Sequence, residues 1–78
     1  MNVGKGRVLN QLRMLRTQHG LTQQEFASLV GATRQTIVAV EAEKYAPSLE
    51  LAFRIARVLG VPFETVFQFK DEEVKPRL

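Results

Sequence analysis

Apolar side chains recur at intervals of three and four positions along much of the chain, which is the spacing of one face of a helix. Near the N-terminus, Val8, Leu12 and Leu15 follow this spacing and predict a first helix over residues 7–19. Gly20 comes next and suits the left-handed conformation that ends many helices. Signals of β-structure are scarce, so a helical protein is expected.

The stretch TQQEFASLVG predicts a second helix with a defined beginning and end. Thr22 can accept a hydrogen bond from the amide of Glu25, and the Glu25 carboxylate can reach back to Thr22, an arrangement called a capping box. Phe26 and Val30 are four residues apart and share one face of this helix. Gly31 is expected to end it.

A third helix is predicted almost immediately afterwards. Thr33 can cap its start, and it is expected to run to about Glu41. Because Thr33 comes two residues after Gly31, the second and third helices must cross steeply instead of running side by side. Ile37 and Val40 form the apolar side of the third helix.

Two further helices are expected in the C-terminal half of the chain. Ser48 opens the fourth helix, which ends at Gly60. Pro62 suits the first turn of a short fifth helix that reaches about Phe67. The predicted fold class is all-α, a compact bundle of five helices that contains a helix-turn-helix.

The length fits a single domain over residues 1–78, with a short basic arm at 1–6 and a charged tail at 70–78. The net charge is +3, and it is unevenly placed, because residues 1–21 contain basic residues and no acidic ones; this favours a polyanionic partner. There is no cysteine, and one histidine without a thiol does not make a structural zinc site, so neither a metal nor a cofactor is expected. No small-molecule ligand is evident. No apolar run fits a membrane span or a secretory signal, so we expect a cytoplasmic protein without a membrane partner.

The side of the third helix that faces away from Ile37 begins with polar side chains and continues with small ones. Arg34 and Gln35 lie in the first turn, Val38 lies on the flank, and Ala39 points outward. The major groove of B-DNA admits a helix of this kind, since arginine pairs with guanine, glutamine pairs with adenine, and small apolar groups contact the thymine methyl. Taken alone, this segment fits a solvated face with ordinary alanines equally well.

Seven positions have the residue types and spacing of a helix-turn-helix: a polar start, apolar anchors around a small residue, a turn glycine and two buried aliphatics, namely Gln23, Phe26, Ala27, Val30, Gly31, Ile37 and Val40. On these residues, and on LRMLR, GLTQQEFASLVGATRQTI and YAPSLELAFRIARVLGV, the chain resembles the Xre or Cro-repressor-like helix-turn-helix regulators over about residues 9–69. The resemblance implies a lambda-repressor-like domain that binds operator DNA as a homodimer and often represses transcription.

The resemblance also implies roles for individual residues. The residues expected to contact bases are Thr33, Arg34, Gln35, Val38 and Ala39. Those expected to contact the DNA backbone are Gln23, Lys44 and Tyr45. Arg16 and Glu41 match a partly buried salt bridge between the first and third helices. Two unrelated surface charges are the alternative, but an unpaired carboxylate on the apolar side of a helix would be costly.

Glu43 departs from the pattern of the family, whose members usually carry glycine just past the third helix. If the backbone there keeps a positive φ, glutamate costs about 1 kcal/mol relative to glycine. Otherwise the loop differs, and the placement of Lys44 and Tyr45 against DNA differs with it.

The fourth helix carries more apolar surface than a lone surface helix needs, because Leu51 and Val58 add a flank to its core stripe. One reading is that all of these side chains fill one small core. The other is a dimer interface made of Leu51, Val58, Phe63, Phe67 and Phe69. The alternation over residues 67–70 could suit a short strand in that interface. We favour the dimer because two-fold symmetry is the commonest oligomeric arrangement and operator half-sites require it.

The expected function is that of a sequence-specific DNA-binding transcriptional regulator, a repressor. It would place the third helix of each subunit of a homodimer into the major groove of double-stranded DNA. The alternative is an antitoxin or co-regulator whose main partner is another protein. His19, the single histidine, lies near a helix C-terminus without a second catalytic group beside it in sequence, so an enzyme is not expected.

Overall fold

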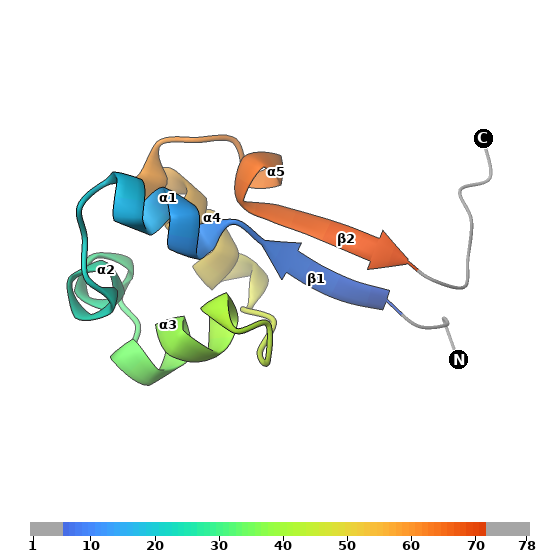
Figure 1. Ribbon diagram of the computed structural model, residues 1–78, viewed down its shortest axis with the longest axis horizontal. Helices are drawn as coiled ribbons and strands as arrows, with labels where there is room; N and C mark the ends of the chain where they lie inside the picture. Colours follow the sequence, from blue (N-terminus) through green and yellow to red (C-terminus); the bar gives the residue numbers. More distant parts are fainter. Residues whose placement is uncertain (1–5, 72–78) are drawn as a thin grey trace.

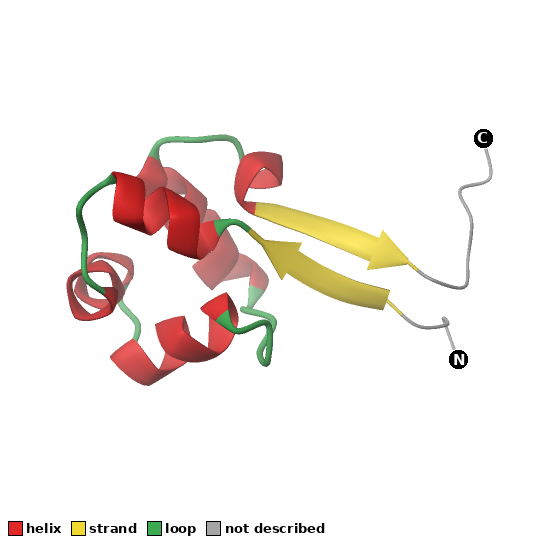
Figure 2. Ribbon diagram, viewed as in Figure 1, coloured by secondary structure: helices red, strands yellow, loops and turns green. Residues whose placement is uncertain are grey.

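The computed structural model describes residues 6–71, in which helices form a body and a two-stranded sheet projects from one side of it (Figures 1 and 2). In chain order the elements are β1 (Gly6–Asn10), α1 (Leu12–Gln18), α2 (Gln23–Val30), α3 (Arg34–Glu41), α4 (Leu49–Leu59), α5 (Phe63–Val66) and β2 (Phe67–Asp71). Residues 1–5 of the predicted arm and residues 72–78 of the predicted tail lie outside the described residues. Gly6, Lys70 and Asp71 belong to the strands.

The sheet corrects the all-α prediction, since the fold is mainly helical with a small β element. Strands β1 and β2 pair antiparallel, with Val8 opposite Phe69. The first helix therefore begins at Leu12 and not at residue 7. The local spacing fitted a longer helix, but pairing with a segment from the other end of the chain extends β1 instead. The strand considered for residues 67–70 is present as β2, and the fifth helix is correspondingly shorter, ending at Val66.

The core lies among the helices and is built from the predicted apolar stripes. Its buried apolar residues are Leu12, Leu15, Phe26, Ala27, Val30, Ile37, Val40, Ala52, Ile55, Ala56, Leu59, Val66 and Phe67. Val8 is the exception to the predicted stripe of the first helix, because it lies in β1 and is 37% exposed. Burial of these side chains is what holds helices this short in place, since helices of seven to eleven residues are marginal alone.

Both ends of α2 form as the sequence predicts. The capping box of α2 is complete, with the amide of Glu25 donating to the Thr22 hydroxyl and the amide of Thr22 donating to the Glu25 carboxylate. This second bond is the main cause of the lowered pKa of Glu25. Gly31 ends α2 with a φ of 75°, which a residue with a Cβ rarely adopts. Ala27 is fully buried, and its small side chain lets α2 and α3 cross closely.

Among residues 6–71, no helix combines the length and the apolar run that crossing a bilayer requires.

Candidate nucleic-acid interface

The start of α3 is fixed by Thr33, which precedes the helix and caps it. The Thr33 hydroxyl accepts a hydrogen bond from the amide of Thr36 at 3.2 Å and also lies 3.0 Å from the Thr36 hydroxyl. The next two side chains, Arg34 and Gln35, are exposed at the tip of the helix. The cap therefore sets the direction in which α3 begins and presents two polar side chains with donor groups to solvent.

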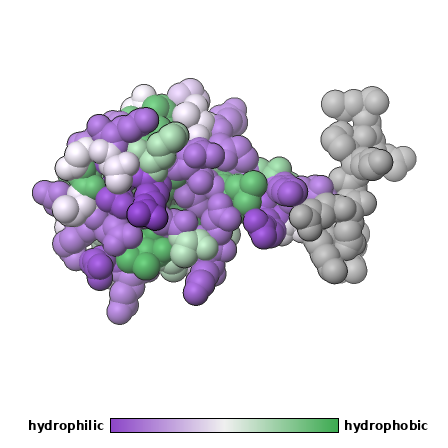
Figure 3. Space-filling model, in the orientation of Figure 1, coloured by the Kyte–Doolittle hydropathy of each residue, from purple (hydrophilic) through white to green (hydrophobic). Residues whose placement is uncertain are grey.

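The two sides of α3 differ sharply in burial. Ile37 and Val40 have no exposed surface, whereas Gln35 is exposed and Val38 is 38% exposed. Ala39 is half-buried and has only a methyl group beyond its backbone. Figure 3 shows that the face of the molecule drawn there is mainly hydrophilic, with separate hydrophobic areas. No other part of the described chain covers the tip of α3, so a large partner can approach its outward side.

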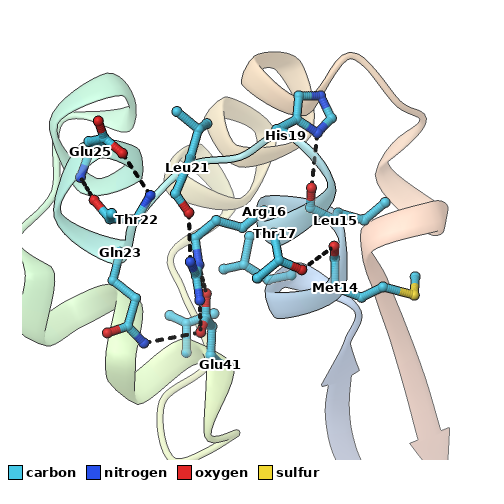
Figure 4. Close-up of polar contacts among 12 residues, drawn as sticks. Met14, Leu15, Arg16, Thr17, His19, Leu21, Thr22, Gln23, Glu25 and Glu41 are labelled. Carbon is cyan, nitrogen blue, oxygen red and sulfur yellow. Dashed lines mark hydrogen bonds and ion pairs between the residues drawn. The ribbon is translucent and has the colours of Figure 1, made fainter.

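An ion pair fixes the other end of α3 to α1, as Figure 4 shows. The Arg16 Nε donates to Glu41 Oε2 at 2.6 Å, and its Nη2 donates to Glu41 Oε1 at 3.2 Å. The two side chains are 9% and 5% exposed, so the ion pair expected between Arg16 and Glu41 is present and buried. The hydrogen bonds to Glu41 raise the pKa of Arg16, and they outweigh the opposing effect of burial.

The same ion pair reaches the beginning of α2. Arg16 Nη1 donates to the carbonyl of Leu21 at 2.7 Å, and the side-chain amide of Gln23 donates to Glu41 Oε1 at 3.2 Å (Figure 4). Glu41 therefore connects α3 to α1 through Arg16 and to α2 through Gln23. Gln23 is half-buried and keeps a second amide hydrogen, which is the donor that a phosphate at the start of α2 would need.

The loop after α3 follows the pattern of a Schellman motif, in which two amides bond back to the last turn of a helix. The amide of Glu43 donates to the carbonyl of Val40, and the amide of Lys44 donates to the carbonyl of Ala39, each at 3.0 Å. Glu43 has a φ of 60° and is the one non-glycine residue with a positive φ among residues 6–71. The backbone at Glu43 therefore keeps the positive φ, and the expected cost of about 1 kcal/mol relative to glycine applies. The loop leaves Lys44 and Tyr45 exposed next to the end of α3.

Two residues that sequence reasoning missed connect the sheet to the end of α3. The Asn10 side chain donates from Nδ2 to the carbonyl of Val40 at 2.8 Å and accepts from the amide of Leu12 at 3.1 Å. Arg7 forms an ion pair with Glu43 at 3.7 Å. Asn10 lies two residues before Leu12, and an asparagine close to the beginning of an apolar helical pattern is a known start signal that could have placed the beginning of α1.

The five residues predicted for a dimer interface do not share one environment. Phe67 is only 6% exposed and belongs to the core of the single chain, so it has little surface to offer a partner. Leu51, Val58 and Phe63 are partly buried against that core, and Phe69 is 67% exposed. Near Phe69 a groove of about 370 Å³ opens between the sheet, α5 and the start of α4; its lining is mostly apolar and consists of Val8, Ala46, Pro47, Leu49, Ala52, Phe63, Phe67, Gln68 and Phe69.

Comparison with known proteins assigns the family. Residues 12–66 match the family model described as "Helix-turn-helix". The chain belongs to the Xre-like helix-turn-helix family. The members of this family are DNA-binding transcriptional regulators and not a class of enzymes.

Relatives of nearly the same length support this assignment. An HTH-type transcriptional regulator of Methanothermobacter thermautotrophicus is 59% identical over 65 residues, which cover 82% of this chain and 94% of the relative. An HTH-type transcriptional regulator of Methanocaldococcus jannaschii is 48% identical over 64 residues, covering 82% and 97%. Among solved structures, the restriction-modification controller protein C.AhdI of Aeromonas hydrophila is similar with a TM-score of 0.66 and 33% identity, covering 69% of this chain and 82% of that one.

Proposed function

We propose that this helix-turn-helix protein binds operator DNA sequence-specifically and represses transcription, with α3 as the recognition helix. The observation that carries the proposal is the outward side of α3. Its inner side chains, Ile37 and Val40, are fully buried, while Gln35 is exposed and Ala39 is small. A helix that is polar at its tip and short-chained along its outward side fits the B-DNA major groove, which is about 12 Å wide.

The residues on this side can make distinct base contacts. Arg34 would donate to O6 and N7 of guanine, and Gln35 would pair with N6 and N7 of adenine. Val38 and Ala39 would contact thymine methyl groups. Thr33 lies at the tip as well, and its hydroxyl is already engaged in the cap, so it would meet DNA mainly by packing. Specificity would therefore be strongest at the bases that face the first turn of α3.

Backbone contacts would come from both ends of the motif. Gln23, at the beginning of α2, would donate its remaining amide hydrogen to a phosphate of one strand. Lys44 and Tyr45, just past the end of α3, are exposed and would meet the phosphates on the other side of the groove. Such contacts make binding strongly dependent on salt.

A homodimer is part of this proposal, with a second copy of the chain as the partner of the apolar surface near the sheet. Two recognition helices that read half-sites one DNA turn apart must be held about 34 Å from each other. Leu51, Val58, Phe63 and Phe69 are the candidate contacts, while Phe67 supports them from within the core. A dimer of this kind on a promoter would exclude polymerase, which is the reason to expect repression.

Selection of bound sequences from random duplex DNA, followed by anisotropy titrations, tests the proposal. We expect an enriched, roughly palindromic motif and an affinity for it at least about 10³ times that for unrelated DNA, as is typical of specific binders. Equal affinity for enriched and scrambled duplexes at moderate salt would reject sequence-specific recognition.

The alternative function is an antitoxin or co-regulator whose main partner is another protein. The observation that favours it is the exposure of large apolar residues on α4 and β2, with Leu49 67%, Phe53 54% and Phe69 67% exposed. Light scattering separates the two proposals. A stable dimer of the purified protein supports the regulator, whereas a monomer that self-associates non-specifically supports a missing partner of another kind.

A further inference from the structure

Arg7 lies on β1, outside the residues 12–66 that match the helix-turn-helix family, yet it contacts the loop that follows α3. Its guanidinium is 3.7 Å from the carboxylate of Glu43, the residue just past the end of α3. Figure 1 shows β1 as the strand that lies nearer to the loop after α3. A cation from the terminal sheet is thus brought to the part of the molecule where backbone contacts are proposed.

The Arg7 side chain is available for a further partner. It is 65% exposed, and its separation from Glu43 is that of an ion pair and too long for a hydrogen bond. A guanidinium has five N–H donors in a flat fork that matches two oxygens of a phosphate.

The side chain of Glu43 contacts β1 although its backbone conformation suits glycine better. It occupies a left-handed conformation, with φ of 60°, in which glycine would fit without strain. Its carboxylate lies 3.7 Å from the Arg7 guanidinium and accepts a long hydrogen bond of 3.4 Å from the amide of Asn10. The strained residue therefore connects the end of α3 to β1 at two points.

One groove brings these groups together with the proposed backbone contacts. It lies between β1 and the loop after α3, and it is lined by Gly6, Arg7, Val8, Ala42, Glu43, Lys44, Tyr45 and Ala46. Arg7 lines it from β1, and Lys44 lines it from the loop after α3. A DNA backbone that reaches Lys44 therefore passes close to Arg7.

We propose that Arg7 is a further DNA-backbone contact, which binds a phosphate beside the one met by Lys44, and that Glu43 is the positioning residue that holds Arg7 there. This inference rests on the proposed function, since it assumes that α3 enters the major groove. It adds β1, an element outside the helix-turn-helix, to the surface that binds DNA.

Salt dependence of binding is the test, because each lost phosphate contact lowers the slope of log affinity against log salt by about 0.9. The probe is the duplex selected by the wild-type protein, followed by anisotropy over a range of salt concentrations. We expect Arg7→Ala to lose about one unit of slope and Arg7→Lys to keep it. The matched control is Arg57→Ala, which removes the same charge from the exposed surface of α4. An equal slope for Arg7→Ala and Arg57→Ala would overturn the proposal.

The Glu43→Ala background shows whether Arg7 contacts DNA or only neutralises the charge of Glu43. If Arg7 only neutralises Glu43, then Arg7→Ala has no effect on the slope once Glu43 is also alanine, and the proposal fails. If Arg7 binds phosphate, the slope still falls in that background. For the positioning role, Glu43→Ala should weaken binding when Arg7 is present and strengthen it when Arg7 is alanine, because only repulsion from DNA then remains. If Glu43→Ala strengthens binding both with Arg7 present and with Arg7 replaced by alanine, Glu43 does not position Arg7.

The test also distinguishes failure of this inference from failure of the proposed function. Backbone contacts do not depend on sequence, so the slopes of Arg7→Ala and wild type can be compared on a random duplex as well. If the protein shows no sequence preference but Arg7→Ala still lowers the slope of log affinity against log salt, the Arg7 contact is supported and sequence-specific recognition is rejected. Far-UV circular dichroism melts of each variant confirm that the compared proteins are folded.

Discussion

Replacement of Glu43 by glycine should stabilise the protein, although it removes every contact of that side chain. The left-handed conformation costs a residue with a Cβ about 1–2 kcal/mol. Glycine recovers this cost but loses about 0.4–1 kcal/mol through the greater freedom of its unfolded chain. The lost contacts contribute little: Arg7 is 65% exposed, and such ion pairs contribute about 0–1 kcal/mol, while the hydrogen bond from the Asn10 amide is long, at 3.4 Å.

These terms leave a net gain of a few tenths of a kcal/mol for Glu43→Gly, on the order of 0.5 kcal/mol. Glu43→Ala is the matched control, since it removes the same contacts but keeps the strain. We expect glycine to exceed alanine by about 1 kcal/mol, which corresponds to roughly 4–8 °C in the melting temperature of a domain of this size. Thermal melts and urea titrations measure both variants. An alanine variant as stable as the glycine variant would refute the argument that backbone strain is stored at Glu43.

Three further variants examine other parts of the molecule. Glu41→Ala leaves the buried guanidinium of its partner without a counter-ion and should cost about 3–5 kcal/mol in urea unfolding, whereas Glu50→Ala, in an exposed pair, should cost less than about 1 kcal/mol. Gln35→Ala should weaken binding to the selected duplex by about 1–3 kcal/mol and leave the melting temperature unchanged, and a parallel fall in both would point to a structural role. Because the pKa of Glu25 is lowered by folding, its stabilisation is present above its unfolded pKa and is lost as the pH falls through its lower folded pKa. Glu25→Gln should therefore lose less stability than wild type between neutral and acidic pH, and an identical loss in thermal melts would contradict the assignment.

Features fixed by near neighbours in the chain were predictable from sequence. The capping box of Thr22 and Glu25 depends on residues three apart, and the turn at Gly31 depends on the absence of one Cβ. The resemblance to the family supplied the pairing of Arg16 with Glu41, and the cost of an unpaired carboxylate on an apolar helix side supported it. In each case the energy comes from local geometry or from a single large burial cost.

Features that depend on pairing between distant parts of the chain were not predictable in the same way. Val8 fits a helical stripe with Leu12. It lies in β1 instead because this segment pairs with β2, where Phe69 is opposite Val8. Phe67 was assigned to a subunit interface because sequence alone does not show that the single chain already covers it. The Asn10 bridge was missed for the same reason, since its acceptor at Val40 lies 30 residues away.

Helix α3 is held at both ends by contacts with the rest of the chain. A helix of eight residues is not stable by itself, so α3 keeps its direction through the cap at Thr33, the buried ion pair of Glu41 and the hydrogen bond from Asn10 to Val40. Gln35 takes no part in these contacts. Substitution of Asn10 by alanine should therefore lower stability and DNA affinity together, whereas substitution of Gln35 should lower affinity alone. Gln35 can therefore change the specificity proposed for α3 without loss of the contacts that direct this helix, whereas Thr33 serves both as the cap and as a residue at the proposed DNA surface.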